Sequence, residues 1–370
     1  MGYNTWYEYG AGITEAKVLA QAQAMESDGL AAAGYNVIAL DDGWQGTTAA
    51  ARAAGASLTW NATDFPHGIP WLAGQLKSMG FRLGIYTAIG KNTCTDHGAL
   101  AGSYGNYSGD AALFARWGVT FVKVDSCGGM PAGTKLAALL ADFQQFGKYI
   151  EAAGMGYSEE APVGMPVGSP QYLTAVAESS KIANAWRVAP DESWVDSERT
   201  TVIGHLNDDL PLARYASPGH WNDLDMLVPG EVDAHPFKWS VTDEQSQLAV
   251  WAMEASPLLL STNVTGLTPA ELAPLVNPAM IAIDQSGSQA SHQGLSGSIR
   301  YLYKGADGGM AVMLANTGSG TAGIALPLSQ AGLSSANAKI RDVFASSTVS
   351  NKLRATLAPG RAALYVLNPS

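Results

Sequence analysis

The sequence predicts an α/β protein, a (β/α)8 TIM barrel followed by a small C-terminal antiparallel β-sandwich. The first observation is a regular alternation of short β-rich runs with helix-like stretches over residues 1–285, which is typical of a parallel sheet. The second is the number of repeats, because eight strand–helix units over this length fit a closed barrel better than an open sheet. The third is a change of pattern near Asn277, after which no long helical stretch follows.

The eight predicted strands are short and apolar, as the run Phe121-Val-Lys-Val-Asp125 illustrates. They cover residues 1–6, 37–41, 82–87, 120–125, 156–159, 184–187, 221–225 and 258–261. Thr14 and Gly34 bracket the first predicted helix as its N-cap residue and the glycine beyond its end. The predicted helices cover residues 15–33, 68–79, 110–117, 135–153 and 243–255.

The C-terminal part consists of short strand-like runs separated by turns rich in Gly, Asn and Ser. Asp307-Gly-Gly309 between the first two runs indicates a hairpin. The predicted strands cover residues 299–303, 310–315, 322–326, 338–342 and 362–367. We therefore place the barrel domain at residues 1–285 and the β-sandwich at residues 286–370.

The composition limits the class of partner. The chain has 370 residues, of which 47% are hydrophobic and 14% are charged, as is typical of a globular protein. Its 32 acidic and 21 basic residues give a net charge of −11, so we expect binding neither to nucleic acid nor to an acidic membrane. No apolar run is long enough to predict a transmembrane helix, and no signal peptide is evident in this chain.

Polar residues follow the predicted strands at the point where each strand ends. In a barrel of this class the active site is built at the carboxyl ends of the strands. The residues at these ends are Asp41, Asp42, Tyr86, Lys123, Asp125, Glu159, Glu160, Arg187, Asp191, Asp223 and Asp225. So many carboxylates and cations exceed what solvation of a surface requires, and they predict a functional site at this face.

Lys123 and Asp125 are two residues apart on one strand, so their side chains point to the same face. A neighbouring ammonium group favours the ionised carboxylate, which is the form that a nucleophile needs. A structural ion pair inside the barrel explains the same spacing equally well. If a carboxylate on another loop donates a proton, the pair would have the signature of glycoside hydrolysis.

Aromatic residues and cysteines allow two readings each. An aromatic ring packs well against the C–H face of a sugar, although core packing accounts for some aromatic residues near strand ends. Taken alone, Cys94 and Cys127 fit two buried free thiols. The aromatic residues near the strand ends are Trp6, Trp44, Tyr86, Trp186, Trp194 and Trp221.

At these positions the sequence resembles glycoside hydrolase family 27, whose typical members are α-galactosidases. The resemblance covers essentially the whole chain, including the C-terminal segments at residues 341–344 and 358–364. The motifs that carry it are Met1-Gly-Tyr-Asn-Thr-Trp6, Asp41-Asp-Gly-Trp44, Phe65-Pro-His-Gly68, Gly84-Ile-Tyr86, Lys123-Val-Asp-Ser-Cys127, Trp186-Arg187 followed by Asp191, and Trp221-Asn-Asp-Leu-Asp-Met226.

The resemblance implies a retaining, exo-acting hydrolase that removes terminal α-D-galactosyl residues from oligosaccharides or glycoconjugates by double displacement. Asp125 would be the nucleophile. Asp191 would be the acid/base, and its spacing from Trp186-Arg187 selects it over Glu192. Such an enzyme needs no cofactor and no metal, and its partner is a small carbohydrate or a polysaccharide.

The resemblance also implies which residues bind the sugar. Asp41 and Asp42 would hold the hydroxyls at C4 and C6, and Lys123 those at C3 and C4. Glu160 and Arg187 would lie near the C2 hydroxyl. The remaining substrate-binding residues would be Trp6 and Tyr86 in the wall, Val163 in the loop after the fifth strand, and Asp225 and Met226 at the rim.

The resemblance changes the meaning of the cysteines, because Cys94 and Cys127 fall where the family has a disulfide. Ala11 and Gly43 stand where the family often has a second pair. A Cys94–Cys127 disulfide would indicate an extracellular or otherwise oxidising compartment. The sequons at Asn61, Asn106 and Asn263 are too short to carry weight.

The loop after the fifth strand departs from the family. Its residues 158–164 carry Ala161 and Gly164 in place of large aromatic residues, and Ala88 replaces a usual Asp. Retention of Glu160 favours galactose over N-acetylgalactosamine. The alternatives on this scaffold are an isomaltose-releasing dextranase, a β-L-arabinopyranosidase and an α-N-acetylgalactosaminidase.

Two readings from other classes remain. The carboxylates together with His205 and His220 could be metal ligands of a hydrolase, although no spacing typical of metal-binding histidines supports this. A non-catalytic sugar-binding protein would keep the pocket, but it would not need both Asp125 and Asp191.

Overall fold

A computed structural model describes residues 1–95, 99–126, 128, 135–191, 198–231, 239–290, 292–306, 309–327, 339–345, 348–349 and 352–368. The chain divides into two compact units. The first unit comprises Met1–Val188, Glu231–Pro236 and Leu258–Gly266. The second unit comprises Ala189–Gly230, Phe237–Pro257 and Leu267–Ser370.

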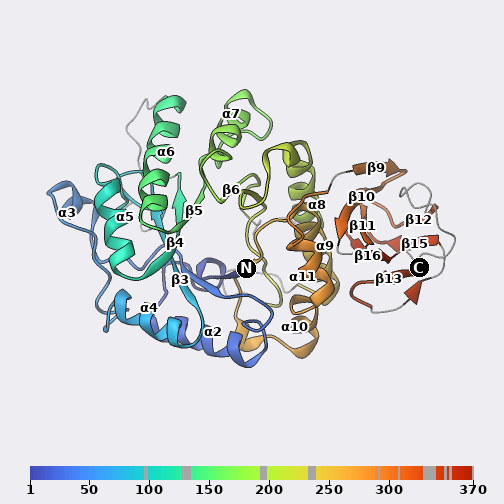
Figure 1. Ribbon diagram of the computed structural model, residues 1–370, viewed down its shortest axis with the longest axis horizontal. Coiled ribbons are helices and arrows are strands. Elements are labelled where there is room, and N and C mark those ends of the chain that lie inside the picture. The colour runs from blue at the N-terminus through green and yellow to red at the C-terminus, as the bar shows by residue number, and fades with distance from the viewer. Residues whose placement is uncertain are drawn as a thin grey trace. The chain divides into compact units, whose positions relative to one another are not determined.

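The parallel sheet confirms the predicted fold class, because its eight strands follow one another along the chain with helices between them (Figure 1). Its order is β7-β6-β5-β4-β3-β2-β1-β8. The apolar side chains of the short strands are buried, as in Ile38 and Val122, which explains their sequence pattern. The strands are β1 (Gly2–Asn4), β2 (Val37–Leu40), β3 (Arg82–Ala88), β4 (Val119–Asp125), β5 (Gly156–Glu159), β6 (Ala185–Arg187), β7 (Trp221–Asp223) and β8 (Leu259–Leu260).

The helices of the first unit flank the sheet (Figure 1). The N-cap role of Thr14 is confirmed, since its side chain accepts a hydrogen bond from the N–H of Lys17. The helix predicted over residues 15–33 ends at Ser27, because Gly29 adopts a φ of 82° that an α-helix cannot continue. The helices are α1 (Trp6–Tyr9), α2 (Glu15–Ser27), α3 (Ala49–Ala53), α4 (Ile69–Ser78), α5 (Tyr107–Arg116), α6 (Leu136–Ala152) and α7 (Pro170–Ser179).

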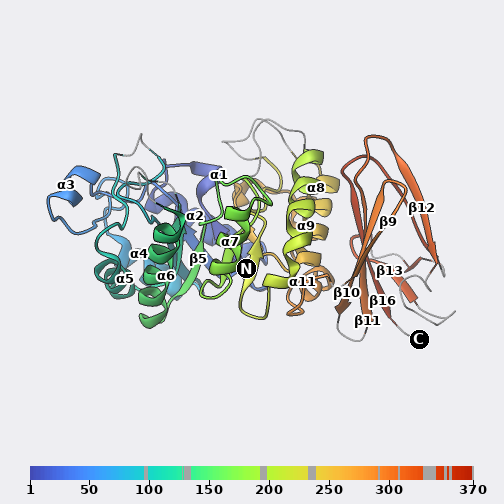
Figure 2. The same ribbon diagram turned by 90° about the horizontal axis from the view of Figure 1, so that it is seen from above.

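The second unit contains the remaining long helices, and Figure 2 shows α8 and α9 side by side. Its central helix, α9, begins with a capping box in which Ser240 and Asp243 satisfy each other's backbone N–H groups. The helices are α8 (Glu198–Asp209), α9 (Val241–Glu254), α10 (Pro269–Leu275) and α11 (Pro278–Asp284).

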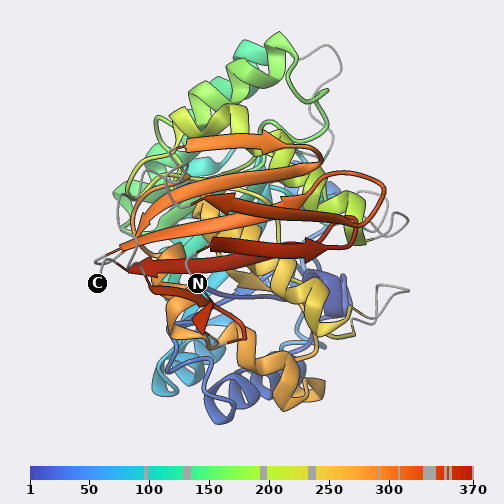
Figure 3. The ribbon, with the colours of Figure 1, turned by 90° about the vertical axis from the view of Figure 1, so that its right-hand side faces the viewer.

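The C-terminal sandwich is confirmed (Figure 3). Its larger sheet has the order β14-β13-β16-β11-β10-β9, and β12 pairs with β15 in the smaller one. Leu326 and Leu353 of the smaller sheet share a core with Val312 and Leu367 of the larger one. Strands β9, β14 and β15 were not predicted. The strands are β9 (His292–Ser296), β10 (Ile299–Ala306), β11 (Gly309–Asn316), β12 (Ala322–Pro327), β13 (Lys339–Asp342), β14 (Thr348–Val349), β15 (Lys352–Leu357) and β16 (Ala362–Asn368).

Within the second unit, a buried lysine links the sandwich to the helices. Lys304 of β10 is fully buried, and its ammonium group donates to the carbonyl of Ala252 in α9 at 2.7 Å. Burial lowers the pKa of Lys304 to about 8, although Asp284 and Glu254 act in the opposite direction. The helices thus supply the polar partners of a side chain from the sandwich, and the proposed boundary at residue 285/286 cuts between them.

Candidate functional site

The register of the parallel sheet determines which side chains meet at the carboxyl ends of its strands. Leu40 of β2 pairs with Ile85 of β3, and the following residue, Tyr86, pairs with Lys123 of β4. Asp41 follows Leu40 directly, so it reaches the level of Tyr86 and Lys123. Residues from three separate strands therefore converge at one edge of the sheet.

Lys123 joins the carboxylates of this edge. Its Nζ atom lies 2.9 Å from Asp41 Oδ2 and 3.2 Å from Glu160 Oε1. The same atom is 5.6 Å from the centroid of the Tyr86 ring. Burial by itself lowers the pKa of this amine, but the charges of Asp41, Glu160 and Asp125 hold it well above its ordinary value. The side chain is therefore an ammonium group at neutral pH.

Glu160 is shared by two cations. It follows β5 directly, and its Oε1 atom accepts a hydrogen bond from Nη1 of Arg187 at 3.2 Å while contacting Lys123. Its backbone N–H donates to the carbonyl of Val124 in β4 at 3.0 Å, which fixes the start of the loop. Glu160 and Arg187 are 4% and 2% exposed, so this pair is held in a nearly dry environment.

Asp125 ends β4, and Tyr86 contacts both it and Lys123. The Tyr86 hydroxyl donates to Asp125 Oδ2 at 3.4 Å. Burial and the charge of Asp125 raise the pKa of Tyr86 well above its ordinary value, so the hydroxyl keeps its proton. The Sγ atom of Cys94 lies 3.0 Å from the same carboxylate oxygen and 3.0 Å from the Tyr86 hydroxyl.

Asp42 is held by the loop that follows β3. Its Oδ2 atom accepts a hydrogen bond from the N–H of Thr95 at 3.1 Å, and its Oδ1 atom accepts one from Gly43 at 2.9 Å. Burial raises the pKa of Asp42, while the hydrogen bonds from Thr95 act in the opposite direction. The two adjacent aspartates therefore have different environments, one facing a cation and the other facing a loop.

Asn4 and Thr5 support Asp41, and sequence reasoning missed both. Asn4 Nδ2 donates to Asp41 Oδ2 at 2.7 Å, and the Asp41 N–H donates to Thr5 Oγ1 at 2.9 Å. Asn4 Oδ1 also accepts from the N–H of Trp6 at 2.8 Å, which starts helix α1. The signal in the sequence was that a buried strand ends in two polar residues, Asn4 and Thr5, because buried polar side chains need hydrogen-bond partners.

Trp6 and Val163 are partly exposed. Trp6 begins α1 rather than ending the first strand, so the strand predicted over residues 1–6 is too long. Val163 lies in the turn that Glu160 starts, where its N–H donates to the Glu160 carbonyl at 3.0 Å. Trp44 belongs to the core, packed edge-on against Phe114.

Three further predicted residues belong to the second unit. Asp191 is exposed. Asp225 is buried and adopts a φ of 84°, a left-handed conformation that Trp251 supports by donating to its carbonyl at 2.9 Å. Met226 is 4% exposed. Cys127 and Trp194 lie outside the described residues, so the predicted Cys94–Cys127 disulfide stays a prediction.

The first-unit part of the site has more negative than positive groups, which disfavours anionic ligands and favours positive charge developing on a neutral one. Its carboxyl groups are Asp41, Asp42, Asp125 and Glu160, and its cations are Lys123 and Arg187. Over the described ranges, no group of three or more His, Cys, Asp or Glu side chains is arranged to hold a metal ion. No helix within those ranges is long and apolar enough to cross a membrane.

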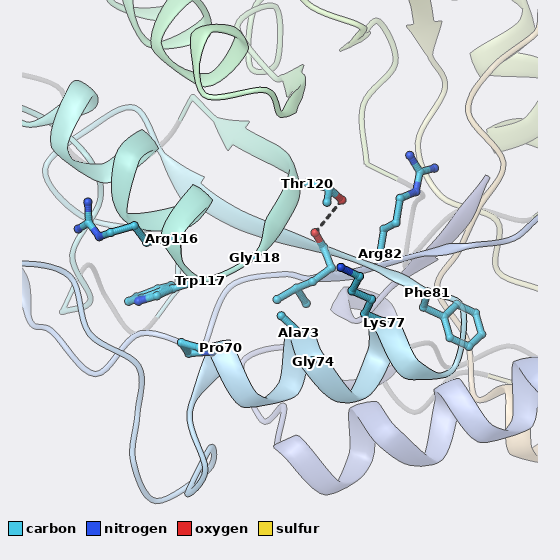
Figure 4. A pocket seen from close by; sticks show the side chains of 11 residues that line it. Pro70, Ala73, Gly74, Lys77, Phe81, Arg82, Arg116, Trp117, Gly118 and Thr120 are labelled. Atoms are coloured by element: carbon cyan, nitrogen blue, oxygen red, sulfur yellow. Dashed lines mark hydrogen bonds between the residues drawn. The ribbon is translucent and has the colours of Figure 1, made fainter.

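A separate pocket of about 410 Å³ lies at the opposite, amino-terminal edge of β3 and β4 (Figure 4). Lys77, Arg82 and Arg116 line it. Lys77 and Arg116 lie in the last turns of α4 and α5, where a cation compensates the carbonyl end of a helix. No predicted site residue lines this pocket, and the amino-terminal face of such barrels serves stability.

Known proteins resemble this chain along its whole length. Residues 7–286 match the family model described as alpha galactosidase A, and residues 296–367 match the alpha galactosidase C-terminal beta sandwich domain. The Probable alpha-galactosidase A of Aspergillus clavatus is 34% identical over 90% of this chain, and the chain spans 64% of that relative's length. Alpha-galactosidase 2 of Arabidopsis thaliana is 30% identical, with 99% of this chain and 88% of the relative covered.

Solved structures agree with this relationship. The crystal structure of alpha-galactosidase I from Mortierella vinacea superposes with a TM-score of 0.84 at 25% identity. The superposition covers 100% of this chain and 96% of that one. With both family models matched in order and a relative covered nearly end to end, the chain belongs to glycoside hydrolase family 27, the alpha-galactosidase family.

Proposed function

We propose that the protein is a retaining α-galactosidase that removes terminal α-D-galactosyl residues from oligosaccharides or glycoconjugates. The observation that carries the proposal is the position of Lys123, which contacts Asp41 and Glu160 and carries its charge beside Asp125. Such a cluster can bind several hydroxyls of one neutral sugar and keep a nucleophilic carboxylate ionised. Membership of the alpha-galactosidase family supports the same activity.

The proposed reaction has two displacement steps. Asp125 attacks the anomeric carbon, the bond to the leaving oxygen breaks, and Asp191 gives that oxygen its proton. Asp191 then takes a proton from water, which attacks the anomeric carbon and releases Asp125 as the free carboxylate. The excess negative charge of the site stabilises the positive charge that develops on the sugar in both transition states.

The proposed sugar contacts follow the geometry of the first unit. Asp41 and Asp42 accept hydrogen bonds from the hydroxyls at C4 and C6, and Lys123 donates to those at C3 and C4. Glu160 and Arg187 contact the C2 hydroxyl. Trp6, Tyr86 and Val163 are the further sugar-binding residues that we propose from the first unit, and the family resemblance adds Asp225 and Met226 from the second.

The nucleophile and the acid/base can be tested separately. Asp125→Asn keeps the shape of the side chain and should lower kcat on p-nitrophenyl α-galactoside on the order of 10³-fold or more. Asp191→Ala should lose activity on natural substrates. Azide should restore its turnover of p-nitrophenyl α-galactoside and yield α-galactosyl azide. An unchanged rate in Asp125→Asn, or full activity of Asp191→Ala on oligosaccharides, would reject the corresponding role.

The loop after β5 keeps a second substrate open. Ala161 and Gly164 stand where the resemblance implies large aromatic residues, and in this loop Ala161 is fully buried while Val163 is partly exposed. Rates on p-nitrophenyl α-galactoside, β-L-arabinopyranoside and α-N-acetylgalactosaminide, with dextran alongside, decide among the alternatives. The fastest turnover should be on the α-galactoside, and a preference for any other glycoside contradicts the proposal.

We also propose that Cys94 and Cys127 form a disulfide and that the protein works in an extracellular or otherwise oxidising compartment. The proximity of Cys94 to Asp125 supports a role for this pairing in holding the nucleophile. Mass spectrometry of the native protein after alkylation should show no modified cysteine. Alkylation of both residues without prior reduction would contradict the pairing.

A further inference from the structure

A second pocket, of about 380 Å³, lies in the first unit and is separate from the carboxylates of the candidate site. One wall comes from the end of the loop between β3 and α5, and the other comes from α6. Its lining includes Tyr104, Asn106, Ser108, Asp142, Gln145 and Tyr149.

Two of the three tyrosines that line this pocket are unusually exposed. Tyr104 and Tyr149 are 36% and 39% exposed, and they are two of the five large hydrophobic side chains exposed in the described part of the chain. The other three, which include Trp71, do not line this pocket. Two exposed aromatic rings at one small pocket favour a ligand that has its own apolar face.

The ring of Tyr104 is held in place before any ligand arrives. It packs edge-on against Tyr107 with centroids 6.5 Å apart, and Tyr107 stacks on Phe146 of α6 at 5.0 Å. The Tyr107 hydroxyl donates to the carbonyl of Ile89 at 2.9 Å, which anchors this stack to the end of β3. The ammonium group of Lys91 lies 5.9 Å from the Tyr104 centroid. A ring fixed in this way loses little conformational entropy on binding.

The polar groups of the pocket supply both donors and acceptors. Asp142, Gln145 and Tyr149 are spaced three and four residues apart on α6, so they share one face of the helix. Asn106 is the N-cap residue of α5, but its side chain makes no capping hydrogen bond and instead donates to Asp110. The first N–H groups of α5, near Ser108, therefore remain available as donors.

We propose that this pocket binds one sugar unit of a neutral, galactose-bearing polysaccharide, outside the catalytic centre. Hydroxyls both donate and accept, so they match Asp142, Gln145 and the N–H groups of α5, while the sugar ring packs between Tyr104 and Tyr149. The carboxylate of Asp142 disfavours sulfated or acidic sugars. The loop between β3 and α5 carries both Tyr104 and Cys94, and Cys94 lies beside Asp125. A polysaccharide bound at the pocket would therefore contact the loop that also borders the proposed nucleophile.

The identity of the sugar rests on the proposed function, so the two are tested apart. Binding is measured by affinity electrophoresis in gels containing galactomannan, with Asp125→Asn as the background so that the polysaccharide is not trimmed. Activity is measured on p-nitrophenyl α-galactoside in the otherwise native chain. Production in a bacterium without N-glycosylation keeps a glycan off Asn106, which lies in the pocket.

Tyr104→Ala and Tyr149→Ala should each weaken galactomannan binding about tenfold, equivalent to about 1.4 kcal/mol, and leave kcat/KM on the small substrate unchanged. Trp71→Ala is the matched control, because Trp71 is 36% exposed and stacks on His67 away from the pocket. Equal binding by both tyrosine variants and the control overturns the inference. Absent turnover of the small substrate in the native chain rejects the proposed function instead.

Discussion

Glu159 is a buried carboxyl group directly beside the candidate site. It points to the opposite face of β5 from Glu160, toward α6 and α7, where it lies beside the hydroxyls of Ser179 and Tyr157. These hydroxyls donate to the carbonyls of Ala175 and Phe143. It is 1% exposed, and its Oε2 atom has no partner among the described residues. Burial raises the pKa of Glu159 from 4.5 to about 7, while the neighbouring hydroxyls of Ser179 and Tyr157 act in the opposite direction.

The raised pKa makes stability depend on pH. Between pH 4.5 and 7 the folded protein binds the Glu159 proton and the unfolded chain does not, so the free energy of unfolding falls as the pH rises through this window. A shift of about 2.5 pH units corresponds to about 3 kcal/mol in full, of which 2–3 kcal/mol separate pH 5 from pH 8. The Gln side chain of Glu159→Gln cannot ionise. Between pH 5 and pH 8 the free energy of unfolding of this variant should therefore rise by that amount relative to the wild-type value.

The assay is urea unfolding followed by tryptophan fluorescence at pH 5 and pH 8. The quantity compared is the difference in unfolding free energy between variant and wild type, and the change of this difference with pH. Any effect of the Gln side chain on packing changes the free energy of unfolding equally at both pH values, so it cancels when the two differences are compared. Glu151→Gln, which removes an exposed carboxyl on α6, is the control. A Glu159→Gln difference that is the same at both pH values would refute the burial argument.

Two further substitutions test support for the site and for the sandwich. Asn4→Ala removes the hydrogen bond to Asp41, so we expect a loss of about 1–3 kcal/mol in urea unfolding. It should also lower kcat/KM, and an unaltered kcat/KM would show that Asp41 needs no such support. Lys304→Met leaves Asp284 without its buried cation, and we expect a loss of about 3–5 kcal/mol at pH 7.5. The loss should be smaller at pH 5, because burial raises the pKa of Asp284 to about 7 and the carboxyl is then neutral. A loss that does not change with pH speaks against this charge interaction between Lys304 and Asp284.

The sequence predicted the strands of the parallel sheet well, and in strands such as β2 the run is wholly apolar because both faces of the sheet are buried. The strand over residues 156–159 has the predicted bounds, and the one over residues 37–41 differs by a single residue. Helix α7 was missed because Pro170 at its start reads as a breaker, although proline is favoured in a first turn. Strand β15 was missed although its residues alternate between polar and apolar side chains, which is the pattern of a strand with one buried face, and β12 pairs with it.

The site was predictable where one strand holds the information. The spacing of Lys123 and Asp125 placed both at one edge of the sheet, and Tyr86 contacts both. The approach of Asp41 and Glu160 to Lys123 depends on register between strands, which local sequence does not specify. The proximity of Cys94 to Asp125 depends on the path of a long loop, so it was accessible only through the family resemblance.

The buried Lys304 has a consequence for how this protein can be divided. The family models meet between residues 286 and 296, which suggests two parts that evolution could exchange. The ammonium group of Lys304 nevertheless has its partners in α9 and α11, on the other side of that junction. A sandwich transplanted without these helices would expose the apolar surface around Lys304 to water, so the transferable piece must include α9 and α11 to keep that surface covered.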